Sequence, residues 1–460
     1  MIKKICCTII VLLLLHPAVY SQKQIPPEGG APKDFKLPKK TAFQMENGIA
    51  VTMVQYGKVP KVTVSIVLRT GKQSEKGDEI WLSSIVGMMM KEGTLKRSSE
   101  KIREEAALMG GSLDVSVGDD KTVFNCDVLS EKGPQCIELL ADVLQNPAFP
   151  ENELQRLKND KLRELSILNA DPNSLTSEKF MKVLYKDHPY GMGFPTENII
   201  NGFTIDKIRN FYANNYSAQR CLIYIVGKFD EKDMEEAVRS GFKGWKSSPP
   251  VVVNVPQPSS KREIYIIDRP GGAQSTIMLG LPVIDPSNED YIPLQVTNTL
   301  LGGSFGSRIT SNIREQKGYT YSPYSTVSAR YRTAYWAEIA SVGIKVTGPA
   351  LKEIFYEIDR LRSEPPPEEE LKGIANYIAG TFVLQNSTRG GIINQLSFLD
   401  LHGLPDTYLT NYVKSVHSVT PEKVKDMTTK YIRPDEMTIV ITGDRKVIEP
   451  QVKGYGAIRK

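Results

Sequence analysis

Two short stretches of this sequence decide its fold: Asn-Pro-Ala-Phe-Pro-Glu-Asn-Glu-Leu at 146–154 and Glu-Pro-Pro-Pro-Glu-Glu-Glu-Leu at 364–371. In each, acidic residues and a leucine follow a proline-containing loop, which is a start signal for a helix. The opening residue-Pro pairs are offset by 364 − 146 = 218 residues and the Glu-Leu pairs by 370 − 153 = 217. A nearly constant offset between similar segments indicates a duplicated architecture.

A second pair of segments has almost the same offset. Residues 203–227 and residues 419–443 each contain a threonine, an amphipathic helical pattern that ends in tyrosine, and a strand-like run that ends in glycine. The offset is 216 residues both at Thr420 and at Gly443 (420 − 204 and 443 − 227). The duplication therefore extends through a helix and the strand that follows it.

The repeat predicts an α+β fold of two homologous halves that face one another. Strand-like runs at 49–54 and 62–68 precede a helical pattern at 78–92, so each half mixes strands and helices. We expect each half to be a mixed, largely antiparallel sheet covered by helices. The halves are predicted at 43–243 and 263–460, and a Pro/Ser-rich linker at 244–262 joins them.

The N-terminus has the three parts of a secretory signal peptide. Lys3 and Lys4 precede an apolar run at 5–15, and small residues lead to Ser21. We predict a signal peptide at 1–21 and a flexible or surface-wrapped arm at 22–42. No later stretch offers about 20 consecutive apolar residues, so no transmembrane segment is expected. The chain is therefore predicted to be exported, to a bacterial periplasm or, as the alternative, to the medium.

Composition excludes several classes of protein. The chain has 460 residues, 40% of them hydrophobic, and a net charge of only +5, which gives no support to disorder or nucleic-acid binding. Cys126, Cys136 and Cys221 have no Cys-x-x-Cys spacing and lie among apolar residues, so we expect buried thiols. With only four histidines and no Gly-x-x-x-x-Gly-Lys-Ser/Thr motif, neither a histidine-rich metal site nor nucleotide binding is expected.

Two long motifs follow in the second half: Leu-Leu-Gly-Gly-Ser-Phe-Gly-Ser-Arg at 300–308 and Ile-Arg-Glu-Gln-Lys-Gly-Tyr-Thr-Tyr at 313–321. With the order of the elements, they resemble the insulinase/pitrilysin family of zinc peptidases over essentially the whole mature chain. The resemblance implies a clamshell of two halves. It also implies that Arg314 and Tyr321 reach toward a zinc site and contact the substrate. The glycine-rich turn, with Gly302, Gly303 and Ser304, is expected to lie against a bound peptide.

The zinc motif of that family is degenerate in this sequence. Active members carry His-x-x-Glu-His on their first helix, with a later glutamate as third ligand. Aligning Glu92-Gly93-Thr94 with the family's Lys-Gly-Thr places Ser84, Gly87 and Met88 at the three motif positions. Glu164 lies near the position of the third ligand, and an ordinary ion-pair role is its alternative. We expect no metal on this chain, because one carboxylate cannot hold zinc unaided.

The resemblance implies a split enzyme in which two chains share one active site. This chain would be the noncatalytic subunit, inactive alone, and its insulinase-like partner would carry His-x-x-Glu-His and the zinc, with peptides or unfolded proteins as substrates. In the alternative function, the chain is an inert peptide-binding or scaffold protein of the cell envelope. Arg314 could instead brace its helix and Tyr321 pack beneath a sheet, and a homodimer stays open.

Overall fold

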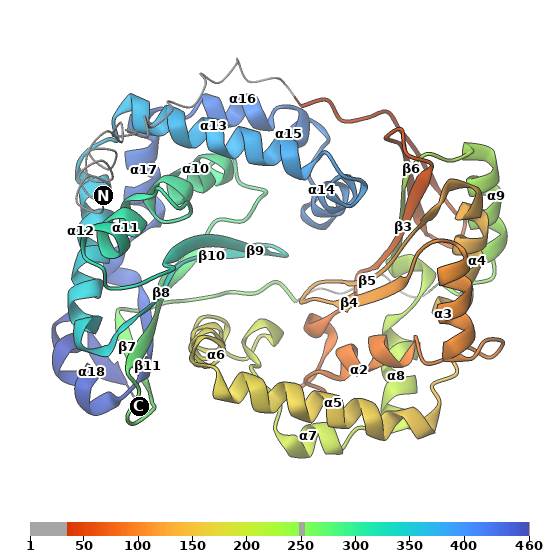
Figure 1. Cartoon of the computed structure of the whole chain (residues 1–460), viewed down its shortest axis with the longest axis horizontal. Coiled ribbons are helices and arrows are strands. Elements are labelled where there is room, and N and C mark those ends of the chain that lie inside the picture. The colour runs from red at the N-terminus through yellow and green to blue at the C-terminus, as the bar shows by residue number, and fades with distance from the viewer. Residues whose placement is uncertain (1–34, 248–253, 460) are drawn as a thin grey trace, which may run out of the picture. The chain divides into compact units, whose positions relative to one another are not determined.

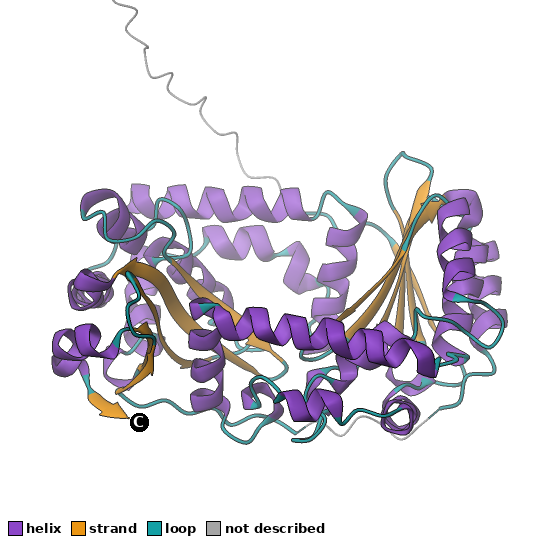
Figure 2. Ribbon diagram, turned by 60° about the horizontal axis from the view of Figure 1, so that its bottom comes forward, coloured by secondary structure: helices purple, strands orange, loops and turns teal. Residues whose placement is uncertain are grey.

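The computed structural model describes residues 35–247 and 254–459, which form two six-stranded sheets with helices along them (Figures 1 and 2). The predicted α+β fold of two similar halves is confirmed. The predicted signal peptide at 1–21 lies outside the described residues. None of the helices in the described ranges is long and apolar enough to span a bilayer.

The first half contains one sheet and eight helices among the described residues. Its strands are β1 Lys40–Gln44, β2 Ala50–Gln55, β3 Lys61–Leu68, β4 Leu113–Val117, β5 Thr122–Leu129 and β6 Cys221–Gly227. Its helices are α2 Leu82–Met89, α3 Ser99–Leu108, α4 Gly133–Gln145, α5 Glu151–Ala170, α6 Pro172–Tyr185, α7 Glu197–Asn201, α8 Ile205–Asn215 and α9 Glu231–Phe242. A short 3-10 turn, η3 Pro189–Gly191, follows α6.

The second half repeats this plan. Its strands are β7 Glu263–Asp268, β8 Gln274–Val283, β9 Tyr324–Arg330, β10 Thr333–Gly343, β11 Thr438–Gly443 and β12 Ala457–Arg459. Its helices are α10 Tyr291–Leu301, α11 Arg308–Thr310, α12 Thr347–Ser363, α13 Glu368–Gln385, α14 Arg389–His402, α15 Thr407–Thr410, α16 Tyr412–His417, α17 Pro421–Tyr431 and α18 Arg445–Val452. A π-helical turn, η5 Ser311–Gln316, follows α11.

The two sheets share one strand order except at one edge. The first runs β1-β2-β6-β3-β5-β4 and the second β12-β7-β11-β8-β10-β9. In each, one strand pair inside the repeat is parallel (β2 with β6, β7 with β11) and the next three pairs are antiparallel. The outermost strands differ, because β1 precedes the repeat and pairs antiparallel, whereas β12 follows it and pairs parallel.

Equivalent residues perform equivalent structural roles in both halves. Helices α5 and α13 begin 217 residues apart (368 − 151), as the repeated motifs predict. Thr204 caps α8 by accepting the N–H of Lys207, and Thr420 caps α17 by accepting that of Lys423. Both repeated strands end at a glycine with positive φ, 148° at Gly227 and 159° at Gly443, a conformation that side chains disfavour.

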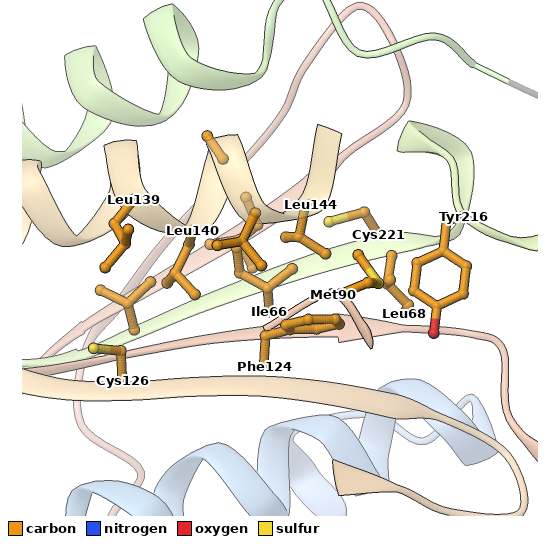
Figure 3. Packing of buried hydrophobic residues seen from close by; sticks show 14 of the residues in the cluster. Ile66, Leu68, Met90, Phe124, Cys126, Leu139, Leu140, Leu144, Tyr216 and Cys221 are labelled. Carbon is orange, nitrogen blue, oxygen red and sulfur yellow. The ribbon is translucent and has the colours of Figure 1, made fainter. Parts of the chain in front are cut away.

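One face of each sheet packs on helices of its own half. In the first half, inward side chains of β3, β5 and β6 meet α4, as Ile66 and Phe124 meet Leu140 in Figure 3. In the second half, the matching face packs on α10, α12, α17 and α18. Because every second residue of a strand points to one face, this contact uses only half of each strand.

The opposite face of each sheet is covered by a helix from the other half. Phe180 and Leu184 of α6 pack on Tyr335 and Val440 of the second sheet. Reciprocally, α14 covers Val67, Tyr224 and other residues of the first sheet with its own apolar side chains, among them Ile392, Ile393 and Leu396. The strands are buried on both faces, which explains why β6 and β11 read as nearly continuous apolar runs.

Ion pairs at the ends of these elements join the two halves. The Arg330 guanidinium at the end of β9 lies 2.7 Å from the carboxylate of Asp119 in the β4–β5 turn. It also lies over the rings of Tyr185 and Tyr190. At the start of α14, Arg389 binds Asp127 of β5 at 2.9 Å. The charges that cross between the halves are thus paired rather than left buried alone.

Three details differ from the sequence-based expectations. The first strand begins at Lys40, inside the predicted arm at 22–42, and Phe35 of that arm packs edge-on against Phe382 at 5.1 Å. The linker lies against the first half where it is described, since Ser259 donates its N–H to the Leu184 carbonyl. The helix expected at 78–92 is shorter, Leu82–Met89, for reasons given below.

Candidate functional site

The first half presents α2, the helix that corresponds to the degenerate zinc motif. It starts late because Trp81 adopts a left-handed backbone conformation, with φ of 75°. The buried carboxylate of Glu75 accepts the N–H groups of Trp81 and Ser83 at 3.0 and 2.9 Å, and also the Ser83 hydroxyl. Burial raises the pKa of Glu75 to about 7, against these hydrogen bonds, which lower it.

The three motif positions on α2 do not fit a zinc ion. Ser84 and Met88 offer no imidazole. A Cβ atom added at Gly87 would lie 2.9 Å from Cγ2 of Val117 and 3.3 Å from Cγ1 of Val115, both on β4. The space for a glutamate at position 87 is therefore filled by valine side chains. Among residues 35–247 and 254–459, no three His, Cys, Asp or Glu side chains gather as a metal site.

Glu164, at the predicted position of the third ligand, has a different partner. Its carboxylate lies 2.7 Å from the ammonium of Lys161 one turn earlier on α5. Lys161 is 7% exposed, and its ammonium lies 5.2 Å from the centre of the Trp81 ring. A lysine cation thus already neutralises this carboxylate, as the ion-pair alternative for Glu164 expected.

The second half brings all five predicted contact residues to one pocket. Gly302, Gly303, Ser304, Arg314 and Tyr321 line a cavity of about 320 Å³, which we call the Arg314 pocket. Two sequence motifs supply it: the turn after α10 gives the first three residues, and η5 with the segment that follows gives the other two. A π-helical turn is rare and is frequent at functional sites.

Arg314 is held between two aromatic rings. Its guanidinium carbon lies 4.2 Å from the centre of the Phe305 ring and 5.1 Å from that of Tyr321, and Nε lies 3.3 Å from the Glu315 carboxylate. Tyr321 is 80% exposed, so it does not pack beneath a sheet. The rings orient a planar cation whose remaining N–H groups can donate to a carbonyl or carboxylate. The Tyr321 phenol can donate a hydrogen bond beside it.

The two glycines of the turn are required by what lies beneath them. A Cβ at Gly302 would lie 2.6 Å from the carboxylate of Glu338 and 2.6 Å from the Ser325 hydroxyl. A Cβ at Gly303 would lie 2.6 Å from the Asn298 amide. Both carboxylate oxygens of Glu338 are fully buried with no hydrogen-bond partner within the described residues, and burial raises its pKa well above the usual range.

Sequence reasoning missed two residues of this region. Phe305 was quoted as part of a motif but given no role, although an aromatic side chain between glycines is 70% exposed here. A large exposed apolar residue in a glycine-rich turn was the available signal. Glu338 gave no signal, because its environment comes from the packing of β10 beneath α10.

Comparisons with known proteins agree with this geometry. Residues 51–194 match the family described as insulinase (peptidase family M16), and residues 202–377 match the peptidase M16 inactive domain. This chain belongs to the M16 peptidase family. The two matches divide between the halves much as the chemistry does, because the Arg314 pocket falls in the segment that matches the inactive domain.

Relatives of the chain cover most of its length. It is 21% identical to the uncharacterized zinc protease YmxG of Bacillus subtilis, over 87% of this chain and 97% of that protein. A zinc protease of Rickettsia bellii, also uncharacterized, is 26% identical over 71% of this chain and 79% of its own length.

Two solved structures have the same fold. The peptidase M16 inactive domain of Pseudomonas fluorescens aligns with a TM-score of 0.82 and 24% identity, covering 88% of this chain and 98% of that one. A Helicobacter pylori protease aligns with a TM-score of 0.82 and 17% identity, covering 89% and 100%.

Proposed function

We propose that this chain is the noncatalytic subunit of a heteromeric zinc metallopeptidase. The observation that carries the proposal is the contrast between its halves. The α2 positions are packed with Gly87 against valines and hold no zinc ligands, whereas Arg314 and Tyr321 line an accessible pocket. In this proposal the chain is inactive alone, and a second insulinase-like chain supplies His-x-x-Glu-His and the zinc.

The residues of the Arg314 pocket have the chemistry that peptide cleavage needs from a second subunit. Hydrogen-bond donors aimed at the attacked carbonyl stabilise the oxyanion that forms there, and the Arg314 guanidinium and Tyr321 phenol are such donors. The turn with Gly302, Gly303 and Ser304 offers bare backbone to an extended peptide. This chain would therefore bind and orient a peptide or unfolded-protein substrate.

We place this activity in the bacterial periplasm, with secretion as the alternative. The support is the predicted signal peptide at 1–21, with Lys3, Lys4 and the apolar run that follows. The three cysteines of the described residues are free and buried, so the fold does not depend on disulfides in either compartment.

The proposal is tested by affinity purification of the tagged mature protein from its native envelope fraction, with mass spectrometry and zinc analysis. We expect a similar-sized chain with His-x-x-Glu-His to co-purify, with about one zinc ion per pair. In the reconstituted pair, Arg314→Ala should lower turnover about 100-fold, and Arg103→Ala, an exposed position on α3, should not. Unchanged turnover in Arg314→Ala contradicts the role.

A catalytically inert peptide-binding or scaffold protein is the second candidate. It is favoured by the ties between the halves, Arg330 with Asp119 and Arg389 with Asp127, because a fixed arrangement suits binding more than turnover. It predicts peptide or protein binding that is insensitive to chelators and to Arg314→Ala. A chain that elutes alone or as a homodimer, and free of zinc, supports it.

A further inference from the structure

A second pocket lies beside the Arg314 pocket in the second half of the chain. Its volume is about 460 Å³, within the range of ligand sites, and α10, α13, α14, α15 and α16 contribute side chains to it (Figure 1). We call it the amide-lined pocket. Its aromatic residues are Tyr291, Tyr377, Phe382, Phe398, Tyr408 and Tyr412.

The two pockets are continuous around one residue. Tyr377 of α13 is 54% exposed and lines both of them. A second connection runs through α10, because Thr299 lines the amide-lined pocket and its carbonyl accepts the hydroxyl of Ser304, which lines the Arg314 pocket. A ligand that crosses Tyr377 therefore contacts both sites.

The lining of the amide-lined pocket is polar but uncharged. None of its thirteen residues is Asp, Glu, Lys, Arg or His. Gln295 donates to the Tyr291 hydroxyl at 2.8 Å. The side-chain amides of Gln385, Asn394 and Gln395 have no hydrogen-bond partner among the residues that the structure describes. Each of these amides offers two donors and an acceptor to a ligand.

The aromatic wall is already packed before any ligand arrives. Phe382 stacks on Tyr412 with their ring centres 4.3 Å apart, and Phe398 lies 6.0 Å from Tyr408. A preformed wall needs little rearrangement to accept an apolar or aromatic group. A charged group brought against it would lose water and find no opposite charge, which is costly.

We infer that the amide-lined pocket binds an uncharged side chain of the peptide, aromatic or carboxamide-bearing, while the peptide backbone nearby lies against Arg314. This inference rests on the proposed function, which makes a peptide the ligand. The rings of the wall stack on the side chain, and the amides of Gln385, Asn394 and Gln395 bind its polar atoms or the adjoining backbone. The pocket thereby selects against acidic and basic residues at one position of the substrate.

The test uses the mature protein and fluorescein-labelled peptides of sequence (Gly-Ser-X)₄, in which X is Tyr, Gln, Glu or Lys. Repeating X presents it to the pocket in any register, and fluorescence anisotropy gives the dissociation constants. We expect the Tyr and Gln peptides to bind about tenfold more tightly than the Glu and Lys peptides. Gln395→Lys should then strengthen binding of the Glu peptide about fivefold, as a partly buried ion pair does.

Two further variants separate the explanations. Asn376→Lys adds the same charge on α13 at an exposed position outside the pocket, so it measures the long-range attraction alone. Arg314→Ala reports on the proposed function. If Arg314→Ala weakens all four peptides while Gln395→Lys acts no differently from Asn376→Lys, the inference is wrong and the proposed peptide site stands.

If Gln395→Lys reverses the preference while Arg314→Ala changes nothing, the amide-lined pocket is real and the proposed role of Arg314 is wrong. Equal affinity for all four peptides, or no binding of any, overturns the inference. Maltohexaose serves as a neutral probe of another kind. Its binding, if lost in Gln395→Lys while no peptide binds, would assign the pocket to a sugar and overturn the inference as well.

Discussion

Replacing Gly87 by alanine tests whether the place of the zinc motif is filled. In an open helix, Gly→Ala stabilises by about 1 kcal/mol, because alanine has the better helix propensity. Here the new methyl group would lie 2.9 Å from Val117 Cγ2 and 3.3 Å from Val115 Cγ1. Overpacking of this kind costs roughly 1–3 kcal/mol. We therefore expect Gly87→Ala to destabilise the protein by between about 0 and 2 kcal/mol.

The assay is urea unfolding of the wild type, Gly87→Ala, Val117→Ala and the double variant. Val117→Ala removes the atom of closest approach, so the alanine at position 87 should regain its helix-propensity advantage in the double variant. The cycle should give a favourable coupling of at least about 0.5 kcal/mol between the two substitutions. Stabilisation of about 1 kcal/mol by Gly87→Ala alone, with no coupling, would show that α2 has room there and refute the reasoning.

Three further predictions concern buried charges. Glu75 keeps its proton to about pH 7 in the folded protein, against 4.5 as the ordinary value, so folding stability should fall by about 3 kcal/mol as pH rises between these values; urea midpoints of Glu75→Gln should lack this slope. Glu338 shifts in the same direction, so Glu338→Gln should be more stable than the wild type at pH 8, with the advantage vanishing near pH 4. Arg330→Gln should cost about 2 kcal/mol or more by leaving Asp119 without its partner, and speed amide exchange in the β4–β5 turn, whereas Arg332→Gln at an exposed position should do neither.

The duplicated fold could be predicted because its signals are local. Thr204 and Thr420 cap helices within their own segments, and Gly227 and Gly443 end strands where side chains are disfavoured. These constraints act over a few residues, so they survive as repeated sequence. Arg314 and Tyr321 could be placed in one site for the same reason, since seven residues separate them.

The remaining features depend on contacts that sequence spacing does not encode. The exchange of α6 and α14 between the sheets joins Phe180 to Val440, far apart in the chain. Glu75 shortens α2 by taking up its N-terminal N–H groups, which no helix signal near residue 78 announces. The amide-lined pocket gathers side chains from five helices. Tertiary packing, rather than local propensity, decides each of these.

The central claim is that this chain completes the active site of a zinc-binding partner. It is tested most directly by peptide turnover in the complex purified from the native envelope, with wild-type chain or Arg314→Ala, alongside zinc analysis. We predict one zinc ion per pair, no turnover by this chain alone, and about 100-fold slower turnover with Arg314→Ala at unchanged zinc content. Full turnover in Arg314→Ala, or a chain that elutes alone and cleaves peptides, would contradict the account.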